Sequence, residues 1–224
     1  MMEQTEKKTL TDSIGDFITA YRKVILGLLI LIFAAAAAFG IGTAVLSAQK
    51  KSALSDLDAL EVEYSKLQAE ENADAQKKSE IAAKAKALAE KSGGLARTRA
   101  AMFAADIAFA DKNWEESRTY WLMAAKAQSK AYTTPICFYN AAVCCEEAGD
   151  LDAALSYFNT AAENKDFPLV SRALFNAGRI EESRGNYAQA VSLYEKLDAS
   201  YSGTDWANLG KSRIIALRSS GKIQ

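Results

Sequence analysis

Few residues of this chain have the types and the spacing that catalysis requires. The spacing Ser-x-x-Lys, in which a lysine can act as the base for a serine nucleophile, occurs at Ser47 with Lys50 and at Ser219 with Lys222. The first pair lies at the end of a long apolar run, and the second lies close to the end of the chain. No other element of such a catalytic site accompanies them, so both are interpreted as coincidences.

Histidine, the commonest general base and the commonest metal ligand, is absent from the sequence. No glycine-rich phosphate loop follows a predicted strand, because no strand is predicted. We therefore expect no catalytic residue, no metal site and no cofactor, and a protein that is not an enzyme.

The three cysteines are Cys137, Cys144 and Cys145. Their odd number and the lack of a Cys-x-x-Cys spacing argue against a disulfide framework and against a zinc site. Neighbouring residues of a helix point about 100° apart, so Cys144 and Cys145 would pair only with strain. The two interpretations are a redox pair and small apolar filling of a helix packing surface.

Composition excludes some classes of partner. The chain has 224 residues, of which 50% are hydrophobic and 25% charged, with a net charge of −1. These values suit one globular domain plus a further segment, and they exclude a strongly basic nucleic-acid binder. With only 2 prolines and 12 glycines, long helices can run uninterrupted.

The sequence contains a repeated motif, which predicts the helices that would position any site. Residues 149–158 and 185–194 each start with Gly and then Asp or Asn, followed by an amphipathic run, and 112–121 is a degenerate copy. The copies lie 37 and 36 residues apart (112 to 149, 149 to 185), a period typical of helical-hairpin repeats. A helix with small residues among large apolar ones precedes each copy, which allows close packing between hairpins.

This pattern resembles the tetratricopeptide repeat (TPR), a pair of antiparallel helices. The small and aromatic places of the second TPR helix match Ser117 with Trp121, Ala154 with Phe158, and Ala190 with Tyr194. Residues 206–210 match the Trp-x-x-Leu-Gly opening of a first helix without a complete partner helix after it. The resemblance implies an all-α fold, a right-handed TPR-type superhelix with hairpins at 98–134, 135–170 and 171–202, closed by a capping helix and tail at 203–224.

Residues 24–46 contain no charged side chain. At about 1.5 Å per residue, such a helix spans the roughly 30 Å hydrocarbon core of a membrane. An uncleaved anchor is favoured over a cleaved signal peptide, because the apolar run continues past the small residues of 34–38. Residues 1–23 would form a cytoplasmic segment, whose apolar stripe predicts either a helix on the membrane surface or a continuation of the next helix.

Charges beside this span set the expected orientation. Lys7, Lys8, Arg22 and Lys23 precede it, and residues 50–51 are two lysines that follow it. The bias favours an N-terminus inside, which predicts a single-pass protein of the inner (cytoplasmic) membrane with a periplasmic TPR domain.

Residues 47–97 are predicted to form a helical stalk that leads into the repeats. Ala53, Leu57, Leu60, Tyr64 and Leu67 make a heptad-like seam of about two heptads, which is expected either to pair with another copy or to fold onto the repeats. The small residues at 36, 40 and 44 of the membrane span also permit close packing of two membrane helices. A homo-oligomer through the stalk or the span is therefore possible.

The TPR resemblance implies a concave face, lined by the first helices of the hairpins, that binds a peptide or a protein. Aligning the copies places the following residues on it: Arg99, Met102, Asp106, Phe109, Ile136, Tyr139, Asn140, Val143, Glu146, Arg172, Phe175, Asn176, Arg179, Glu182 and Lys211. The alternative for the aromatic members is packing between repeats. Some TPR modules grip carboxylates with a fixed Lys, Asn and Arg set, but Met102, Asp106 and Asn176 stand at its places, so a carboxylate clamp is disfavoured.

The whole layout resembles the ancillary subunit of the SecYEG translocon, a single-span membrane protein with periplasmic TPRs. This resemblance implies a non-enzymatic scaffold beside the export channel that works with periplasmic chaperones. Two alternatives remain: an adaptor for another envelope machine, such as cell-wall synthesis, division or outer-membrane assembly, and a transport-associated binder of a small ligand.

Overall fold

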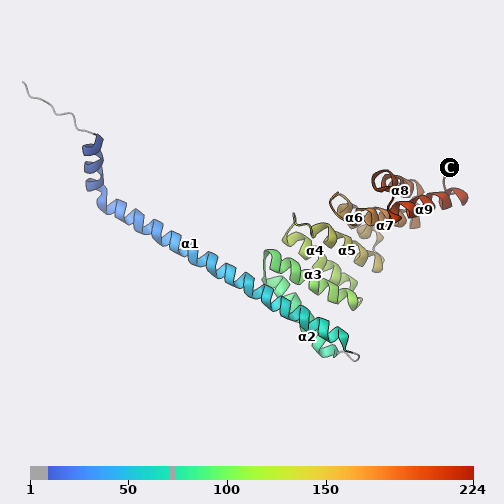
Figure 1. Cartoon of the computed structure of the whole chain (residues 1–224), viewed down its shortest axis with the longest axis horizontal. Coiled ribbons are helices and arrows are strands. Elements are labelled where there is room, and N and C mark those ends of the chain that lie inside the picture. Colours follow the sequence, from blue (N-terminus) through green and yellow to red (C-terminus); the bar gives the residue numbers. More distant parts are fainter. Residues whose placement is uncertain (1–9, 71–73) are drawn as a thin grey trace, which may run out of the picture. The chain divides into compact units, whose positions relative to one another are not determined.

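The computed structural model describes residues 10–70 and 74–224, and within these ranges every regular element is a helix (Figure 1). The predicted all-α fold is confirmed. The helices are α1 (Leu10–Ala69), α2 (Ala75–Lys91), α3 (Gly94–Ala110), α4 (Trp114–Ala127), α5 (Thr134–Glu147), α6 (Leu151–Ala162), α7 (Val170–Ser183), α8 (Tyr187–Tyr201) and α9 (Asp205–Ser219).

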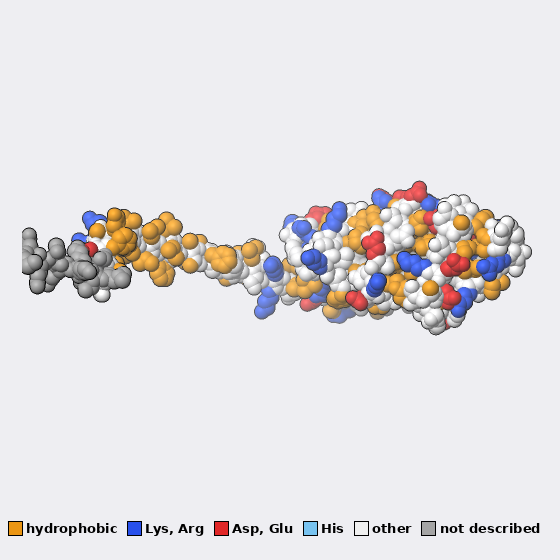
Figure 2. All heavy atoms as spheres, turned by 90° about the horizontal axis from the view of Figure 1, so that it is seen from above, with side chains coloured by type: hydrophobic (Ala, Val, Ile, Leu, Met, Phe, Trp, Pro, Cys, Tyr) orange, Lys and Arg blue, Asp and Glu red, His pale blue; other side chains and the backbone are white. Residues whose placement is uncertain are grey.

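The chain divides into two compact units between Lys51 and Ser52. In the first unit, α1 carries large apolar side chains that are exposed on all sides, including those of residues 28–33 (Figure 2). By length and composition this helix can cross a membrane, and a signal sequence near an N-terminus meets the same test. Residues 10–23 continue directly into the apolar run, and residues 1–9 of the predicted cytoplasmic segment lie outside the described residues.

The second unit begins with a helical hairpin made of the end of α1 and of α2. The predicted seam is buried, with Leu57 and Leu67 at most 1% exposed, and it packs against α2 and α3. The Asp74 carboxylate caps α2 by accepting hydrogen bonds from two backbone N–H groups. Of the two expected arrangements of the seam, the structure shows folding onto the chain's own next two helices, and from Ser52 onward the predicted stalk lies in the same compact unit as the repeats.

Three further hairpins follow, α3 with α4, α5 with α6, and α7 with α8, and α9 packs on α7 and α8. The same left-handed turn joins the two helices of each hairpin. Gly149 and Gly185 have φ of 81° and 80°, and Lys112 takes the equivalent place at 59°. In each turn the next residue's N–H reaches back to a carbonyl five residues earlier, as in Asp150 to Cys145 at 2.8 Å. The degenerate first copy therefore keeps the turn without the glycine that favours it.

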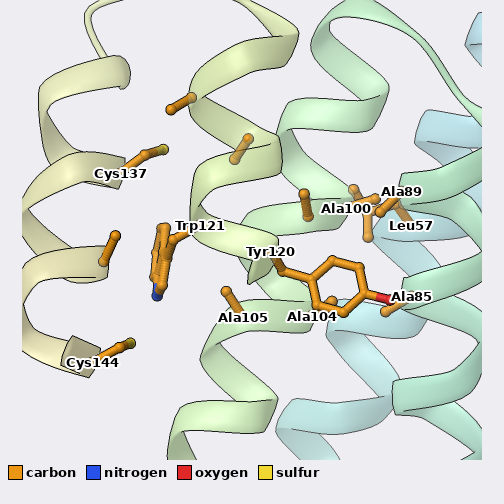
Figure 3. Close-up of a cluster of buried hydrophobic side chains, with 14 residues drawn as sticks. Leu57, Ala85, Ala89, Ala100, Ala104, Ala105, Tyr120, Trp121, Cys137 and Cys144 are labelled. Atoms are coloured by element: carbon orange, nitrogen blue, oxygen red, sulfur yellow. The ribbon is translucent and has the colours of Figure 1, made fainter. Parts of the chain in front are cut away.

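Alanine dominates the interior of the first two hairpins. Figure 3 shows alanines of α2 and α3 around the rings of Tyr120 and Trp121, with Cys137 and Cys144 on the far side of the tryptophan. Small side chains let the helix backbones approach closely, and the two large rings fill the space that remains. Helix α4, which carries both rings, packs on α3 and on α5 and so joins the first helices of these two hairpins.

Candidate partner-binding surface

The first helices of the successive hairpins, α3, α5 and α7, together with α9, carry the residues predicted to line the concave face. The most accessible members are four of the charged ones: Asp106, Arg172, Arg179 and Lys211 are exposed. The remaining predicted members are half-buried, with one exception. They are Arg99, Met102, Phe109, Ile136, Asn140, Val143, Glu146, Phe175, Asn176 and Glu182.

Tyr139 is the exception, because it is only 5% exposed and belongs to the core between repeats. Its ring packs edge-on against Phe158 at 5.3 Å and lies 6.1 Å from Phe167, between centroids. Its hydroxyl oxygen accepts a hydrogen bond from the Asn176 side chain at 3.2 Å. Tyr139 thus has the packing between repeats that was the alternative for the aromatic members, and it joins α5 to α6 and α7.

An aromatic and cationic stack continues from this point toward α9. The guanidinium of Arg172 lies 5.6 Å from the ring centroid of Tyr139 and 5.4 Å from that of Trp206. Phe175 lies 5.3 Å from Trp206 and 5.8 Å from Tyr194, between centroids. Cation–π contacts hold the exposed Arg172 in a defined position without neutralising its charge.

Most of the other charges on these helices are paired across repeats. Glu146 of α5 pairs with Arg179 of α7 at 2.5 Å. Glu182 of α7 accepts hydrogen bonds from the guanidinium of Arg213 on α9 and from the hydroxyl of Tyr194 at 3.1 Å. The Arg213 contact is the main reason that the pKa of Glu182 is lowered.

The charged residues at the two ends of the candidate surface, Arg99 and Lys211, are also ion-paired within the chain. Arg99 donates to Asp58 and to Glu61 of α1, each at 2.8 Å, and Lys211 pairs with Asp198 at 2.8 Å. Arg99 therefore holds α3 against the N-terminal hairpin. These charges stabilise contacts between neighbouring repeats, and they are less available to a partner than their sequence positions suggest.

Two charges of opposite sign stay without an ion-pair partner among the described residues. Arg172 has only its aromatic contacts, and Asp106 has no hydrogen bond or ion pair. Partial desolvation on α3 raises the pKa of Asp106 to about 6, although the side chain is still accessible to water. Between them on α5, Asn140 is half-buried and its amide makes no side-chain hydrogen bond within the described chain.

Of the residues that α9 contributes, sequence reasoning included only Lys211. Trp206 completes the aromatic stack, and Arg213 forms the ion pair with Glu182. In the sequence, Trp206 is recognisable only as part of the opening motif of a first TPR helix, which predicts a closing cap and no binding role. Arg213 has the general appearance of a solvated charge. Its pairing with Glu182, 31 residues earlier, follows from the register of α7 and α9 alone.

The cysteines and one lysine of the Ser-x-x-Lys pairs can be placed in the structure. All three cysteines are free and buried. Burial raises the pKa of the Cys137 thiol to about 12 and that of Cys144 to about 11, which suppresses the reactive thiolate. The ammonium of Lys222 lies 5.0 Å from the ring centroid of Tyr187. Among the described residues, no group of three acidic, cysteine or histidine side chains is placed to hold a metal.

Two hollows of about 500 Å³ lie away from the predicted concave residues. One, on α3, α4 and α6, has basic walls that include Arg97, Arg118 and Lys126. The Arg97 guanidinium donates to two backbone carbonyls, and Arg118 lies beside two carboxylates, so the donors of Arg97 and the charge of Arg118 are largely used within the chain. The other lies between α1 and α2.

Similarity to known proteins is concentrated in the repeat region. Residues 146–203, from the end of α5 to just beyond α8, match the tetratricopeptide repeat family model. A TPR repeat-containing protein of Treponema pallidum (strain Nichols) is 40% identical over 128 residues, which is 57% of this chain. The match covers 54% of that relative, so the chain spans about half the length of the curated relative it matches.

The fold has relatives of known structure. Two crystal structures of nearly identical TPR-like repeats, described as a kinesin light chain of Podosopora anserina, one of them a substituted form, superpose with TM-scores of 0.53 and 0.52. Each match covers 73% of this chain and 85% of the other, at 13% sequence identity, which shows a shared fold. The family model, the curated relative and these structures together support tetratricopeptide repeats in this chain.

Proposed function

We propose that this protein is a non-enzymatic, membrane-anchored scaffold of the cell envelope that binds a polypeptide partner on the face formed by α3, α5, α7 and α9. TPR repeats suggest protein–protein interaction in general, and the chain's own residues support a specific mode. The membrane anchor would raise the local concentration of the repeats at the membrane, so that a low affinity for the partner is sufficient for recruitment.

The observation that carries this proposal is the pair of unneutralised charges on the face, Asp106 on α3 and Arg172 on α7. They lie on first helices that are two hairpins apart. Asp106 is also displaced along the helix axis, by seven residues or about 10 Å, from the position equivalent to Arg172. An extended peptide that crosses the face obliquely, at about 3.3–3.6 Å per residue, would reach both charges. A partner segment with a basic side chain near Asp106 and an acidic side chain near Arg172 would satisfy both charges.

The residues between these charges suit an extended chain. The free amide of Asn140 can donate to and accept from a peptide backbone, and Val143 and Phe175 offer half-buried apolar area. Because Arg172 is held between two rings, little side-chain entropy is lost when it binds a carboxylate.

We further propose that α1 is an uncleaved anchor, with residues 1–23 inside the cell and the repeats outside the inner membrane. The exposed apolar side chains of α1 and the excess of basic residues before the span support this placement. On this basis the scaffold acts beside the protein-export translocon and periplasmic chaperones, as the resemblance of the layout implies.

In-cell photo-cross-linking tests the function and the location together. A photoreactive residue at Val143 lies at the centre of the proposed face, and a matched probe at Lys196, exposed on α8, serves as the control. Capture of translocon subunits, chaperones or exported chains from position 143 and not from 196 supports the proposal. Equal capture from both positions contradicts binding on this face.

The identity of the captured proteins separates the remaining alternatives. Cytoplasmic proteins would overturn the orientation, and division or cell-wall proteins alone would favour an adaptor for another envelope machine. As a second test, Asp106→Asn and Arg172→Ala should each reduce capture from position 143. Exchange of the two charges, Asp106→Arg with Arg172→Asp, should change which partners are captured, because it reverses the polarity of the face.

A further inference from the structure

The hollow between α1 and α2 belongs to the side of the N-terminal hairpin that no other helix of the described chain covers. It has a volume of about 490 Å³. Its walls are made of eight residues: Asp56, Ala59, Leu60, Glu63, Lys84, Ala87, Leu88 and Lys91. The opposite side of the hairpin packs on α3, where the buried seam of α1 lies. In a repeat array, the outer side of the terminal hairpin is the place where a neighbouring hairpin would stack.

The α1 wall of this hollow is an acidic stripe. Asp56, Ala59 and Glu63 are spaced i, i+3 and i+7, so they follow one line along the helix. Two carboxylates thus flank a small central alanine. Asp56 and Ala59 are exposed, and Glu63 is half-buried, with 39% of its side chain accessible.

The α2 wall is a basic stripe with the same spacing. Lys84, Ala87 and Lys91 are again at i, i+3 and i+7, with two ammonium groups flanking a small central alanine. Leu60 and Leu88 lie at the base of the hollow between the two stripes. The hairpin therefore presents two parallel lines of opposite charge with alanine at the middle of each.

These charges are only weakly used within the chain. Among the described residues, Asp56, Lys84 and Lys91 make no ion pair, and Glu63 reaches only Lys77, at 3.8 Å. Opposite charges that line one hollow without pairing across it are free to pair with another molecule.

The two helices are antiparallel, because Leu57 clusters with Ala89 whereas Leu67 clusters with Ile81. A two-fold axis parallel to the helices would place the acidic stripe of one copy against the basic stripe of the other, and the reverse, in a four-helix arrangement. Such an interface is self-complementary, as two-fold dimers require. The central alanines would allow the helices to approach closely, and the half-buried Leu88 of each copy would add apolar contact between the stripes.

We infer that the outer side of the α1–α2 hairpin binds a second copy of this chain through the acidic and basic stripes, forming a two-fold dimer. This inference is independent of the peptide-binding face, which lies on α3, α5, α7 and α9. It also differs from pairing of the membrane span, since the membrane span contributes no residue to it.

Charge reversal tests the inference on the full chain in detergent micelles, by analytical ultracentrifugation. Reversal of the acidic stripe (Asp56→Lys with Glu63→Lys) or of the basic stripe (Lys84→Glu with Lys91→Glu) places like charges opposite each other. We expect each double variant to weaken dimerisation by at least about tenfold, since every opposed ion pair becomes a repulsion. A matched control, Glu147→Lys with Glu195→Lys, changes the net charge as the acidic-stripe reversal does, on exposed positions elsewhere, and should dimerise as the parent does.

The variant that combines both reversals gives the decisive comparison. It restores opposite charges across the two-fold axis, so we expect it to recover dimerisation to within about threefold of the parent. A monomeric parent, dimers that survive either double variant, or a combined variant as weak as the doubles would each overturn the inference. Dimers that survive would instead assign pairing to the membrane span.

A cross-linking experiment checks the register independently of stability. One tagged chain carries Ala59→Cys and a second, differently tagged chain carries Ala87→Cys, while the three native cysteines stay buried. Oxidation of the mixed dimer should link the two tags, and neither single variant alone should cross-link. Links within each variant and none between them would contradict the antiparallel facing of the stripes.

Discussion

Gly178 of α7 provides a sharp test of how the last repeat is packed. A methyl group added at this position would lie 2.5 Å from Cε1 and 2.9 Å from Cδ1 of the Tyr194 ring, closer than such atoms approach in proteins. Tyr194 is fully buried, and its hydroxyl donates to Glu182, so the ring cannot turn away freely. We predict that Gly178→Ala destabilises the repeat region.

The expected magnitude is the difference between two opposing effects. Overpacking a core usually costs about 1–3 kcal/mol. Alanine in a helix interior is favoured over glycine by about 1 kcal/mol, which offsets part of that cost. The difference is about 0–2 kcal/mol, and the 2.5 Å approach to the Tyr194 ring places Gly178→Ala toward the upper end of this range, which is equivalent to up to about 8 °C in the melting temperature at this chain length.

Gly210 of α9 is the matched control, because it contacts the same tyrosine. A methyl group there would lie 3.4 Å from Cβ and Cδ1 of Tyr194, close to an ordinary contact. Gly210→Ala should therefore leave stability unchanged or raise it by up to about 1 kcal/mol. Thermal unfolding followed by circular dichroism compares the two variants. Equal stabilisation by both would refute the close approach of α7 to the Tyr194 ring.

Four further perturbations test individual features. Lys112→Gly should raise the free energy of unfolding by about 0.5–1 kcal/mol in denaturant titrations, because glycine relieves the left-handed backbone of the first hairpin turn. Glu182→Gln should lower stability at pH 7 by about 1 kcal/mol, since the Arg213 contact lowers the Glu182 pKa. That contribution exists above the unfolded pKa and is lost as pH falls through the folded pKa, so parent and variant should converge in acid. Asp106→Asn should have the opposite pH dependence, because the raised pKa of Asp106, about 6, makes its ionised form unfavourable in the fold. The variant should be the more stable protein above about pH 6, and the difference should disappear below about pH 4, which melting curves at several pH values would show. The three buried cysteines should react with a thiol reagent only after denaturation, so rapid labelling of the native chain would contradict their burial.

The repeat period makes most of the fold predictable. Helical hairpins of this kind require a turn, small residues and aromatic residues at fixed distances, and all three can be recognised at neighbouring positions. The turn at Lys112 is predictable although its glycine is missing, because the spacing from Gly149 marks its place. The sequence does not decide whether the apolar seam of α1 pairs with another copy or folds onto the repeats. The seam itself is recognisable, but its partners on α2 are small alanines at 85 and 89, which give a weak signal in the sequence.

The candidate surface is only partly predictable, for a reason that Tyr139 illustrates. An aromatic residue on the first helix of a repeat has the same sequence signature whether it faces a ligand or the next repeat. Phe158 and Phe167, which come later in the chain, decide the outcome by covering its ring. The same holds for Glu146 and Arg179, whose pairing depends on the register of two helices from different repeats.

The order of contacts in the repeat region has a consequence for how the protein reaches its native state. From α2 onward, the main contacts join helices that are next to each other in the chain, and the further contacts described above, such as those of α5 with α7 and of α7 with α9, reach only two helices away. These helices can therefore form their main contacts before distant parts of the polypeptide have folded. Low contact order speeds folding, and nearest-neighbour stacking lets structure propagate from one hairpin to the next. The repeats can therefore assemble in the order of synthesis, each hairpin docking on the one made before it.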